Sequence, residues 1–256
     1  FLQILDLDIL EKQRQGKNQE AREMLEVSWR ISQSLKKDDT LTGQLLALSI
    51  ETLQAGVIPK VDNLSPYWQE RLLEHDYRLS TLKSIEKENL GVYNIIRNRK
   101  VDLPHFRGNF LVNNPLSKPY ARLSVVDYYK TMIQEPERLP TRNICSPEEK
   151  AIRHLAWWNL FYISIQLPWT NEDIEAAKYM LELEFTKKIL QVKELAKQQG
   201  KWPDSFPNLD SKFCPDRQYI YQVSEDGTMT ISLDKQPEWA KDRDLPLTYS
   251  DRTPPK

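Results

Sequence analysis

The chain has 256 residues and balances 36 Lys and Arg against 37 Asp and Glu, which gives a formal net charge of -1. A chain of this length can bury one large core or two modest cores without metals or disulfides. The balanced charge argues against a general nucleic-acid binder. Seven glycines are few, which disfavours phosphate-binding loops, Rossmann turns and all-β folds, because these use glycine at positive φ angles. The composition favours a helical protein.

The first quarter of the chain has apolar residues at spacings of three and four, which predicts packed helices over 2–14, 18–36 and 41–55. In the second helix, the expected apolar stripe is Ala21, Leu25 and Trp29, with Met24, Val27 and Ile31 beside it. In the third, capped at 38–40 and ended by Gly56 and Pro59, we expect Leu41, Leu45, Leu48 and Thr52 to face inward.

A fourth helix is predicted to begin at Ser65-Pro66, because the serine oxygen can accept an orphan amide and proline suits the first helical position. This helix is expected to end at Arg97 and to bend or restart near His75-Asp76. Periodicity is lost over 98–119. We expect this irregular crossing loop to be ordered, because it carries apolar residues with which to pack.

Two further helices are predicted over 120–134 and after Ser146, where Ser-Pro-Glu-Glu forms a capping box. The second is apolar nearly all round, which indicates a helix that runs through the core. A last, long helix is expected from Thr170 to Gly200. Carboxylates occupy its first turn and lysines enrich its later half, as the helix dipole favours.

The chain then alternates apolar and polar residues over 219–224 and 228–233, around Asp226-Gly227, which is a strong hairpin signal. An isolated pair of strands is marginally stable in water. The hairpin must therefore pack on the long helix. We expect residues 246–256 to form a peripheral, proline-rich tail.

These elements predict a mainly α fold: a multi-helix array or bundle of helical hairpins with a small C-terminal antiparallel β-hairpin. The expected division is 1–97 for the N-terminal helical hairpins, 98–119 for the crossing loop, 120–200 for the C-terminal helices, 201–245 for the loop and hairpin, and 246–256 for the tail. All are expected to belong to one continuous globular unit.

The two cysteines, Cys145 and Cys214, lie far apart, without CxxC spacing or a nearby group of histidines, which argues against a zinc site. Two interpretations stay open. The cysteines are either two unrelated free thiols or the two halves of a single disulfide. A disulfide would indicate an extracytoplasmic protein. Each cysteine comes just before Pro or Ser-Pro, in a predicted loop, and that placement suits a disulfide.

The C-terminal segment resembles a known group of proteins. The run KELAKQQGKWPDSFPNL, followed by YIYQVSEDGTMTISL, is similar to the C-terminal module of a large group of bacterial envelope proteins, and to the minimal core of type II secretion pseudopilins. Several predicted helices precede this module, so the pseudopilin assembly role is not implied. Where Asp-Pro-Phe/Trp-Gly often comes before the hairpin, this chain has Cys214-Pro215-Asp216-Arg217, which weakens any inference of a calcium site.

The resemblance to the envelope group extends to EAREMLEVSWRISQSLKKDDTLTGQLLALSIETLQAG and so covers about two-thirds of the chain. It implies a location outside the cytoplasm, with the helical region following a signal or membrane anchor. Because the chain begins at Phe1 without a methionine, we expect that such a segment has been removed.

The sequence carries no recognisable motif for a catalytic residue, a metal site or a cofactor site. None of the three histidines has a partner at metal-binding spacing, and neither a GxSxG elbow nor a Walker loop occurs. We expect His154 to be a hydrogen-bonded core residue and His75 to lie at the surface or at a bend. Only His105, in the crossing loop, is open to a role in a site.

Two pairs of carboxylates are candidates for paired acids: Glu182 with Glu184, and Asp173 with Glu175. Residues two apart on a helix point to different faces. We therefore expect both pairs to be solvated helix surface.

Two candidate contact surfaces remain. The first is a basic stretch formed by Arg97, Arg99, Lys100, Arg107, Lys118 and Arg122. It could bind an acidic protein, a lipid headgroup or an anionic glycan. Alternatively, its side chains are dispersed and solvated. The second is an aromatic patch on one predicted helix, which could instead be buried: Trp157, Trp158, Phe161 and Tyr162.

Together these observations predict a non-enzymatic, extracytoplasmic interaction or scaffold module of a bacterial envelope, with a subunit of a membrane-associated complex as a variant of the same interpretation. Its expected partner is another envelope protein or a membrane complex, with no nucleic acid and with membrane contact only through the missing N-terminal segment. The alternative is a hydrolase that acts on an envelope polymer through carboxylates and His105. A deep pocket with converging Asp, Glu or His would favour the enzyme, and a shallow groove the binding module.

Overall fold

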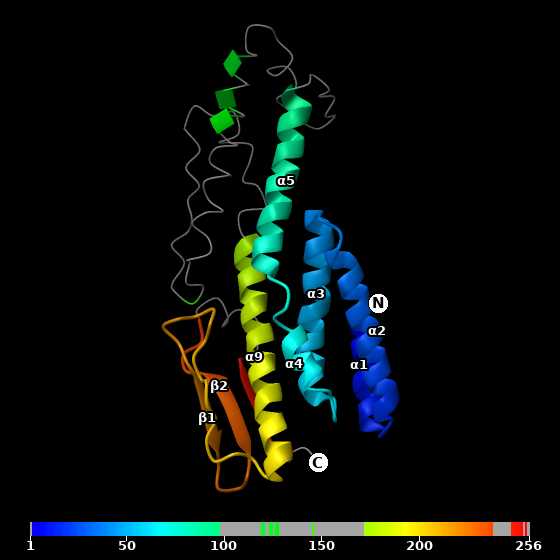
Figure 1. Cartoon of the computed structure of the whole chain (residues 1–256), viewed down its shortest axis with the longest axis vertical. Coiled ribbons are helices and arrows are strands. Elements are labelled where there is room, and N and C mark those ends of the chain that lie inside the picture. Colours follow the sequence, from blue (N-terminus) through cyan, green and yellow to red (C-terminus); the bar gives the residue numbers. More distant parts are fainter. Residues whose placement is uncertain are drawn as a thin grey trace.

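The computed structural model describes residues 2–97, 172–237 and 247–252, together with residues 119–120, 123–124, 126–127, 145 and 254. The first three helices are α1 (Leu2–Arg14), α2 (Asn18–Lys36) and α3 (Leu41–Val57), which pack side by side (Figure 1). Gly16, at φ +75°, turns the chain between α1 and α2. The Thr40 hydroxyl caps α3 by accepting the amide of Gly43 at 3.1 Å. The three predicted helices are confirmed, although α3 runs through Gly56 into the short 3-10 helix η1 (Ile58–Lys60).

The buried faces of α2 and α3 differ from the predicted stripes. On α2, Ala21, Leu25 and Trp29 are buried as predicted, but Val27 is 54 % exposed. On α3, Leu45 and Thr52 are only half-buried, and the inward stripe includes polar residues: Leu41, Gln44, Leu48, Glu51 and Gln54. These polar side chains are buried because α2 presents Ser28, Ser32 and Lys36 to them.

The predicted helix start at Ser65-Pro66 and the restart near His75-Asp76 are confirmed. The structure has two helices, α4 (Tyr67–Arg71) and α5 (Tyr77–Arg97), separated by residues 72–76, the α4–α5 bend. The Ser65 hydroxyl accepts the amide of Tyr67 at 3.4 Å. At the bend, the Asp76 carboxylate accepts the amide of Leu79 at 3.0 Å, so it caps the first turn of α5.

The long helix α9 (Glu172–Gln199) lies between the N-terminal helices and the sheet (Figure 1). One side joins a core built mainly from α1 to α5, through Ala176, Met180, Leu183 and Leu190. Another side joins the core beneath the sheet, through Ala177, Leu181, Phe185, Ile189, Val192 and Ala196. The helix ends at Gln199, and Gly200, at φ +69°, follows it as the predicted stop.

The C-terminal sheet has three antiparallel strands in the order β1 (Tyr219–Val223), β2 (Met229–Leu233) and β3 (Thr248–Asp251). The predicted hairpin is confirmed, with Gly227 at φ +81° in its turn. The prediction of a peripheral tail is wrong for β3, because this strand pairs along β2 and the preceding Leu247, only 1 % exposed, joins the core beneath the sheet. The fold is therefore mainly α with a small C-terminal antiparallel sheet.

Within the described residues, one helical stretch, Leu41–Lys60, is long and apolar enough to cross a membrane. Its most apolar window is 61 % buried in the protein. It also carries Glu51, which is paired with a lysine inside the fold. These features are those of a core helix, since α3 packs against α1, α2, α5 and α9.

Candidate functional site

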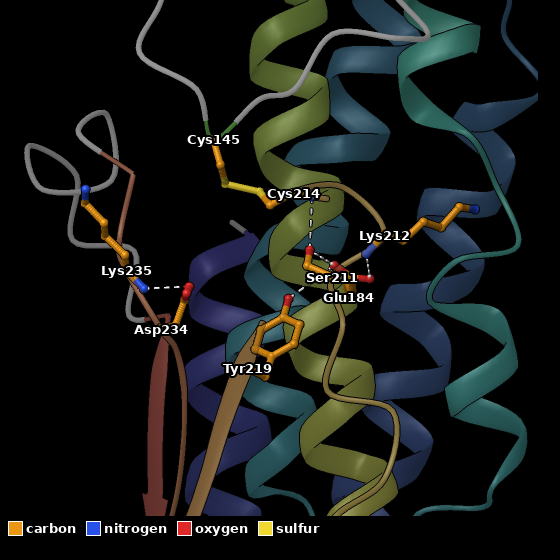
Figure 2. The surroundings of a disulfide bond; sticks show 8 residues. All are labelled: Cys145, Glu184, Ser211, Lys212, Cys214, Tyr219, Asp234 and Lys235. Atoms are coloured by element: carbon orange, nitrogen blue, oxygen red, sulfur yellow. Dashed lines mark hydrogen bonds between the residues drawn. A yellow bond between two sulfur atoms is a disulfide. The ribbon is translucent and has the colours of Figure 1, made fainter. Parts of the chain in front are cut away.

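A disulfide joins Cys145 to Cys214, with the two Cα atoms 5.4 Å apart. Both side chains are buried. Figure 2 shows the bond beside α9, at the end of the loop that carries Ser211 and Lys212. The bond joins residues 69 positions apart, so it ties a distant part of the chain to the C-terminal module. The structure thus brings the two cysteines to disulfide distance, in agreement with the disulfide interpretation.

Glu184 of α9 is the polar centre of this region (Figure 2). Its carboxylate accepts three hydrogen bonds: from the Ser211 hydroxyl at 2.7 Å, the Lys212 amide at 2.7 Å and the Tyr219 hydroxyl at 3.2 Å. Ser211 in turn accepts the amide of Cys214 at 3.1 Å. One carboxylate thus fastens the loop, the disulfide cysteine and β1 to α9.

The surroundings of Glu184 indicate that this carboxylate has a structural role. Its side chain is only 4 % exposed, and all three partners are donors. Burial, with the adjacent Glu184 carboxylate, raises the pKa of Tyr219 and keeps its hydroxyl proton available for donation. The expectation of solvated surface is wrong for Glu184, because the segment after Gly200 folds back over this side of α9.

A second contact holds the same loop. Lys188, one turn after Glu184, is buried and donates from Nζ to the Asn208 carbonyl oxygen at 2.5 Å. Asn208 adopts φ +61°, a left-handed conformation that asparagine tolerates. Burial lowers the pKa of Lys188. The lysine at this position was predicted only as part of a positive helix end, so its role in the loop was missed.

The other buried polar cluster lies among α2, α3 and α5. The Lys36 ammonium is 2.6 Å from the Glu51 carboxylate, which also accepts the Ser32 hydroxyl at 2.9 Å. The same ammonium lies 4.9 Å from the ring centroid of Trp29 and 5.0 Å from that of Tyr77. Burial lowers the pKa of Lys36, while burial and the Glu51 carboxylate raise that of Tyr77. A carboxylate and two aromatic rings thus surround a cation that the chain itself supplies.

The described surface has a groove between η1, the start of α4 and α9, with a cavity volume of about 50 Å³. It is lined by Val61, Asp62, Asn63, Leu64, Ser65, Pro66, Gln69, Leu190, Lys193, Glu194 and Lys197. Lys193 donates to the Pro59 carbonyl at 2.6 Å and pairs with Asp251 at 3.1 Å. Lys197 donates to Asn63 at 3.1 Å. The lysines of this groove therefore make contacts within the fold.

Of the sequence-predicted contact residues, only Arg97 lies on a described element, as the last residue of α5. The rest of the basic stretch lies outside the described residues, as do the aromatic patch, His105 and His154. His75 lies at the α4–α5 bend, as predicted, and is half-buried. In the described part of the chain, no group of three or more His, Cys, Asp or Glu side chains is placed to hold a metal ion.

Family models, curated proteins and solved structures were each compared with the chain, and none matches. The resemblance to envelope proteins and pseudopilins therefore stays a prediction.

Proposed function

We propose that this protein is a non-enzymatic, extracytoplasmic interaction or scaffold module of a bacterial envelope, whose partner is another envelope protein or a membrane complex. The observation that carries the proposal is the Cys145–Cys214 disulfide. Disulfides form and persist in oxidising compartments and are rare where glutathione and thioredoxin keep thiols reduced. A buried, long-range disulfide is what such a compartment supports.

The disulfide also has a mechanical role that suits a scaffold. Closing a loop of 69 positions removes conformational entropy from the unfolded chain equivalent to about 4 kcal/mol on the chain-entropy model. The bond joins the segment around Cys145 to the loop that Glu184 and Lys188 hold on α9. A protein that presents a rigid surface to a partner needs distant parts of its chain to be held in fixed positions.

Among the described residues, the carboxylates of the two buried clusters are held by protein partners, as the binding interpretation expects. Glu51 is paired with Lys36, and Glu184 accepts three protein donors. A general acid or base must instead reach a substrate in a cleft. The groove between η1 and α9, at about 50 Å³, is small beside the several hundred Å³ of ordinary small-molecule pockets.

The location is tested by thiol trapping in the native host. Cells are quenched in acid, free thiols are alkylated under denaturing conditions, and the thiols exposed by later reduction are labelled with a mass tag. We expect both cysteines of the native protein to carry the tag and the Cys145→Ser/Cys214→Ser variant to carry none. Free thiols at both positions in cells would remove the main support for an extracytoplasmic location.

The interaction is tested by crosslinking in intact cells, followed by recovery of the native protein at low salt. A defined envelope protein should be recovered with the native chain and lost with Arg97→Glu/Arg99→Glu/Arg107→Glu, because charge reversal repels an acidic partner. Association that persists unchanged in this variant would rule out the basic stretch as the contact. Failure to recover an envelope protein with the native chain would contradict the scaffold proposal.

A further inference from the structure

The edge of β3 that faces away from β2 carries unpaired backbone groups. The Leu247 carbonyl accepts the Leu233 amide at 3.0 Å, so the backbone groups of Leu247 face β2. In antiparallel strands, the N–H and C=O groups of alternate residues point to the same side. Those of Tyr249 therefore also face β2. The N–H and C=O groups of Thr248 and Ser250 point the other way, to the free edge of the sheet.

These outward groups are open to a partner. Within the described residues, the backbone N–H and C=O groups of Thr248 and Ser250 make no hydrogen bond, and both residues are exposed. The strand also lacks the features that usually protect an edge: Thr248–Asp251 contains neither Pro nor Lys, and its register with β2 has no bulge. An edge of this kind can accept another strand.

The opposite edge of the sheet, along β1, is partly covered by the chain itself. The Leu209 carbonyl accepts the Tyr219 amide at 2.7 Å, and the Ser211 amide donates to the Arg217 carbonyl at 3.3 Å. The loop before β1 thus pairs along the beginning of that strand. In the described part of the chain, β3 has no such cover.

The backbone pattern of β3 is complementary to itself. A second copy can approach in antiparallel register, with Tyr249 opposite Tyr249 of the partner subunit. Thr248 then lies opposite Ser250 of the partner subunit, and Ser250 lies opposite Thr248 of the partner subunit. Each of these two pairs exchanges two hydrogen bonds, so every outward group of both strands is satisfied. The two copies are related by a two-fold axis, which is the commonest symmetry of homo-oligomers.

The side chains agree with this register. Thr248 and Ser250 lie on the face of the sheet away from the core, where the Ser250 hydroxyl is 2.9 Å from that of Thr230. Thr248 of the partner subunit would extend this row of hydroxyl groups across the new pair. Asp251 would lie opposite Leu247 of the partner subunit, so no like charges face each other directly.

We infer that β3 is a self-association edge, through which two copies of this chain join their sheets in antiparallel register about a two-fold axis. A foreign peptide fits this edge less well, because strand addition takes its specificity from pockets for alternate side chains, and β3 presents only small hydroxyl groups on its outer face. A strand of 4 residues buries less area than the roughly 1,200 Å² of stable interfaces, so the dimer is weak and depends on concentration. Self-association of this kind does not depend on the identity of the envelope partner.

The register is tested by crosslinking two single variants, Thr248→Cys and Ser250→Cys, in the oxidised protein. Opposed residues of a hydrogen-bonded pair have Cα atoms about 5.5 Å apart, which suits a disulfide, whereas two copies of the same variant would place them roughly 8 Å apart. Under mild oxidation we expect covalent dimers from a mixture of the two variants and few from either variant alone. Equal crosslinking in the mixture and in the single variants would overturn the inference.

The hydrogen bonds are tested by sedimentation of the protein from micromolar to millimolar concentration. The average mass of the wild type should rise toward that of a dimer. Ser250→Pro removes an N–H group that β2 does not use, and with it half of the donors of the edge, so the dissociation constant should rise about tenfold or more. The matched control, Ser250→Thr, keeps this N–H group and should associate like the wild type.

Three results would overturn the inference. The first is a wild-type protein that stays monomeric at millimolar concentration, and the second is a dimer that Ser250→Pro does not weaken. The third is slow amide exchange at Thr248 and Ser250 in the dilute monomer, since the chain itself would then cover the edge. The first and third are measured on the wild type and do not depend on how the proline variant folds.

Discussion

Replacement of Glu184 by glutamine tests whether one buried carboxylate fixes the loop with Ser211 and Lys212, and strand β1, to helix α9. The substitution keeps the shape of the side chain but removes its charge and turns one acceptor oxygen into a donor group. Three donors now point at Glu184, from Ser211, Lys212 and Tyr219. In Glu184→Gln, the amide NH2 group takes the place of one carboxylate oxygen and therefore points at a hydrogen-bond donor that it cannot accept from.

The expected loss can be worked from these three contacts. A hydrogen bond to a charged group contributes about 1.5–3 kcal/mol to stability, and a neutral one about 0.5–1.5 kcal/mol. At best, two of the three charged bonds become neutral bonds and the third is lost, which costs about 4–5 kcal/mol before any compensation. Part of this is offset, because the buried charge no longer has to be desolvated. We expect a net destabilisation of about 2–3 kcal/mol.

The assay is urea and thermal unfolding of the oxidised protein at pH 7. A loss of about 2–3 kcal/mol should lower the Tm by roughly 5–10 °C for a chain of this size. The control is Glu194→Gln on the same helix, where the carboxylate accepts the exposed Gln198 amide at 3.2 Å and, within the described part of the chain, no other hydrogen bond. This variant should stay within about 0.5 kcal/mol of the wild type. Equal stability of the two variants would refute the structural role assigned to Glu184.

Two further predictions concern the two cores. Asp6 of α1 is only 7 % exposed, one of its carboxylate oxygens has no hydrogen-bond partner among the described residues, and burial raises its pKa to about 6. Because the folded pKa exceeds the unfolded value of about 3.8, the free-energy penalty for ionising buried Asp6 grows as the pH rises from 3.8 to 6 and is constant above. Asp6→Asn should therefore stabilise the protein by about 2 kcal/mol at pH 7.5 but not at pH 4. Equal effects at both pH values in urea unfolding would contradict this. Leu247→Ala should lower the free energy of unfolding by about 2–4 kcal/mol through the cavity it leaves, whereas Val223→Ala, at a 40 % exposed position, should lower it by less than about 1 kcal/mol. Equal losses in the two variants would mean that β3 is not part of the core.

Much of the fold could be predicted because its signals are local. The helix periods of α1 and α2, the Thr40 cap and the glycine after α9 depend on residues within a few positions of one another. The Asp226-Gly227 turn is local in the same sense, because the Asp226 carboxylate accepts the Thr228 amide at 3.1 Å. Such features are recognisable without knowledge of the rest of the chain.

The buried polar residues could not be predicted by the same reasoning. Glu184 was predicted to be solvated helix surface, since an isolated carboxylate is costly to bury, and no sequence pattern singled out Glu51. Each is buried only because partners arrive from elsewhere: Lys36 lies 15 positions before Glu51, while Ser211 and Lys212 lie 27 and 28 positions after Glu184. Helical period does not encode such pairings.

The C-terminal strand shows the same limit in a sheet. Thr248–Asp251 is short and polar, and on its own it resembles a tail. It becomes a strand because β2 offers an unpaired edge, and because Leu247 can enter the core beneath the sheet. Backbone groups at a sheet edge gain from pairing whatever the sequence of the strand that meets them.

By itself, then, the sequence determined the helical character, the ends of most described helices, the β-hairpin and the candidate cysteine pair, because these depend on periodicity, capping and turn residues. The tertiary structure alone decided that α9 is shared by two cores, that β3 completes the sheet and that Glu184 anchors the loop carrying Cys214. The physical reason is one of distance along the chain: a charge or a strand edge is buried only when distant segments bring it a partner, and that is decided when the elements pack.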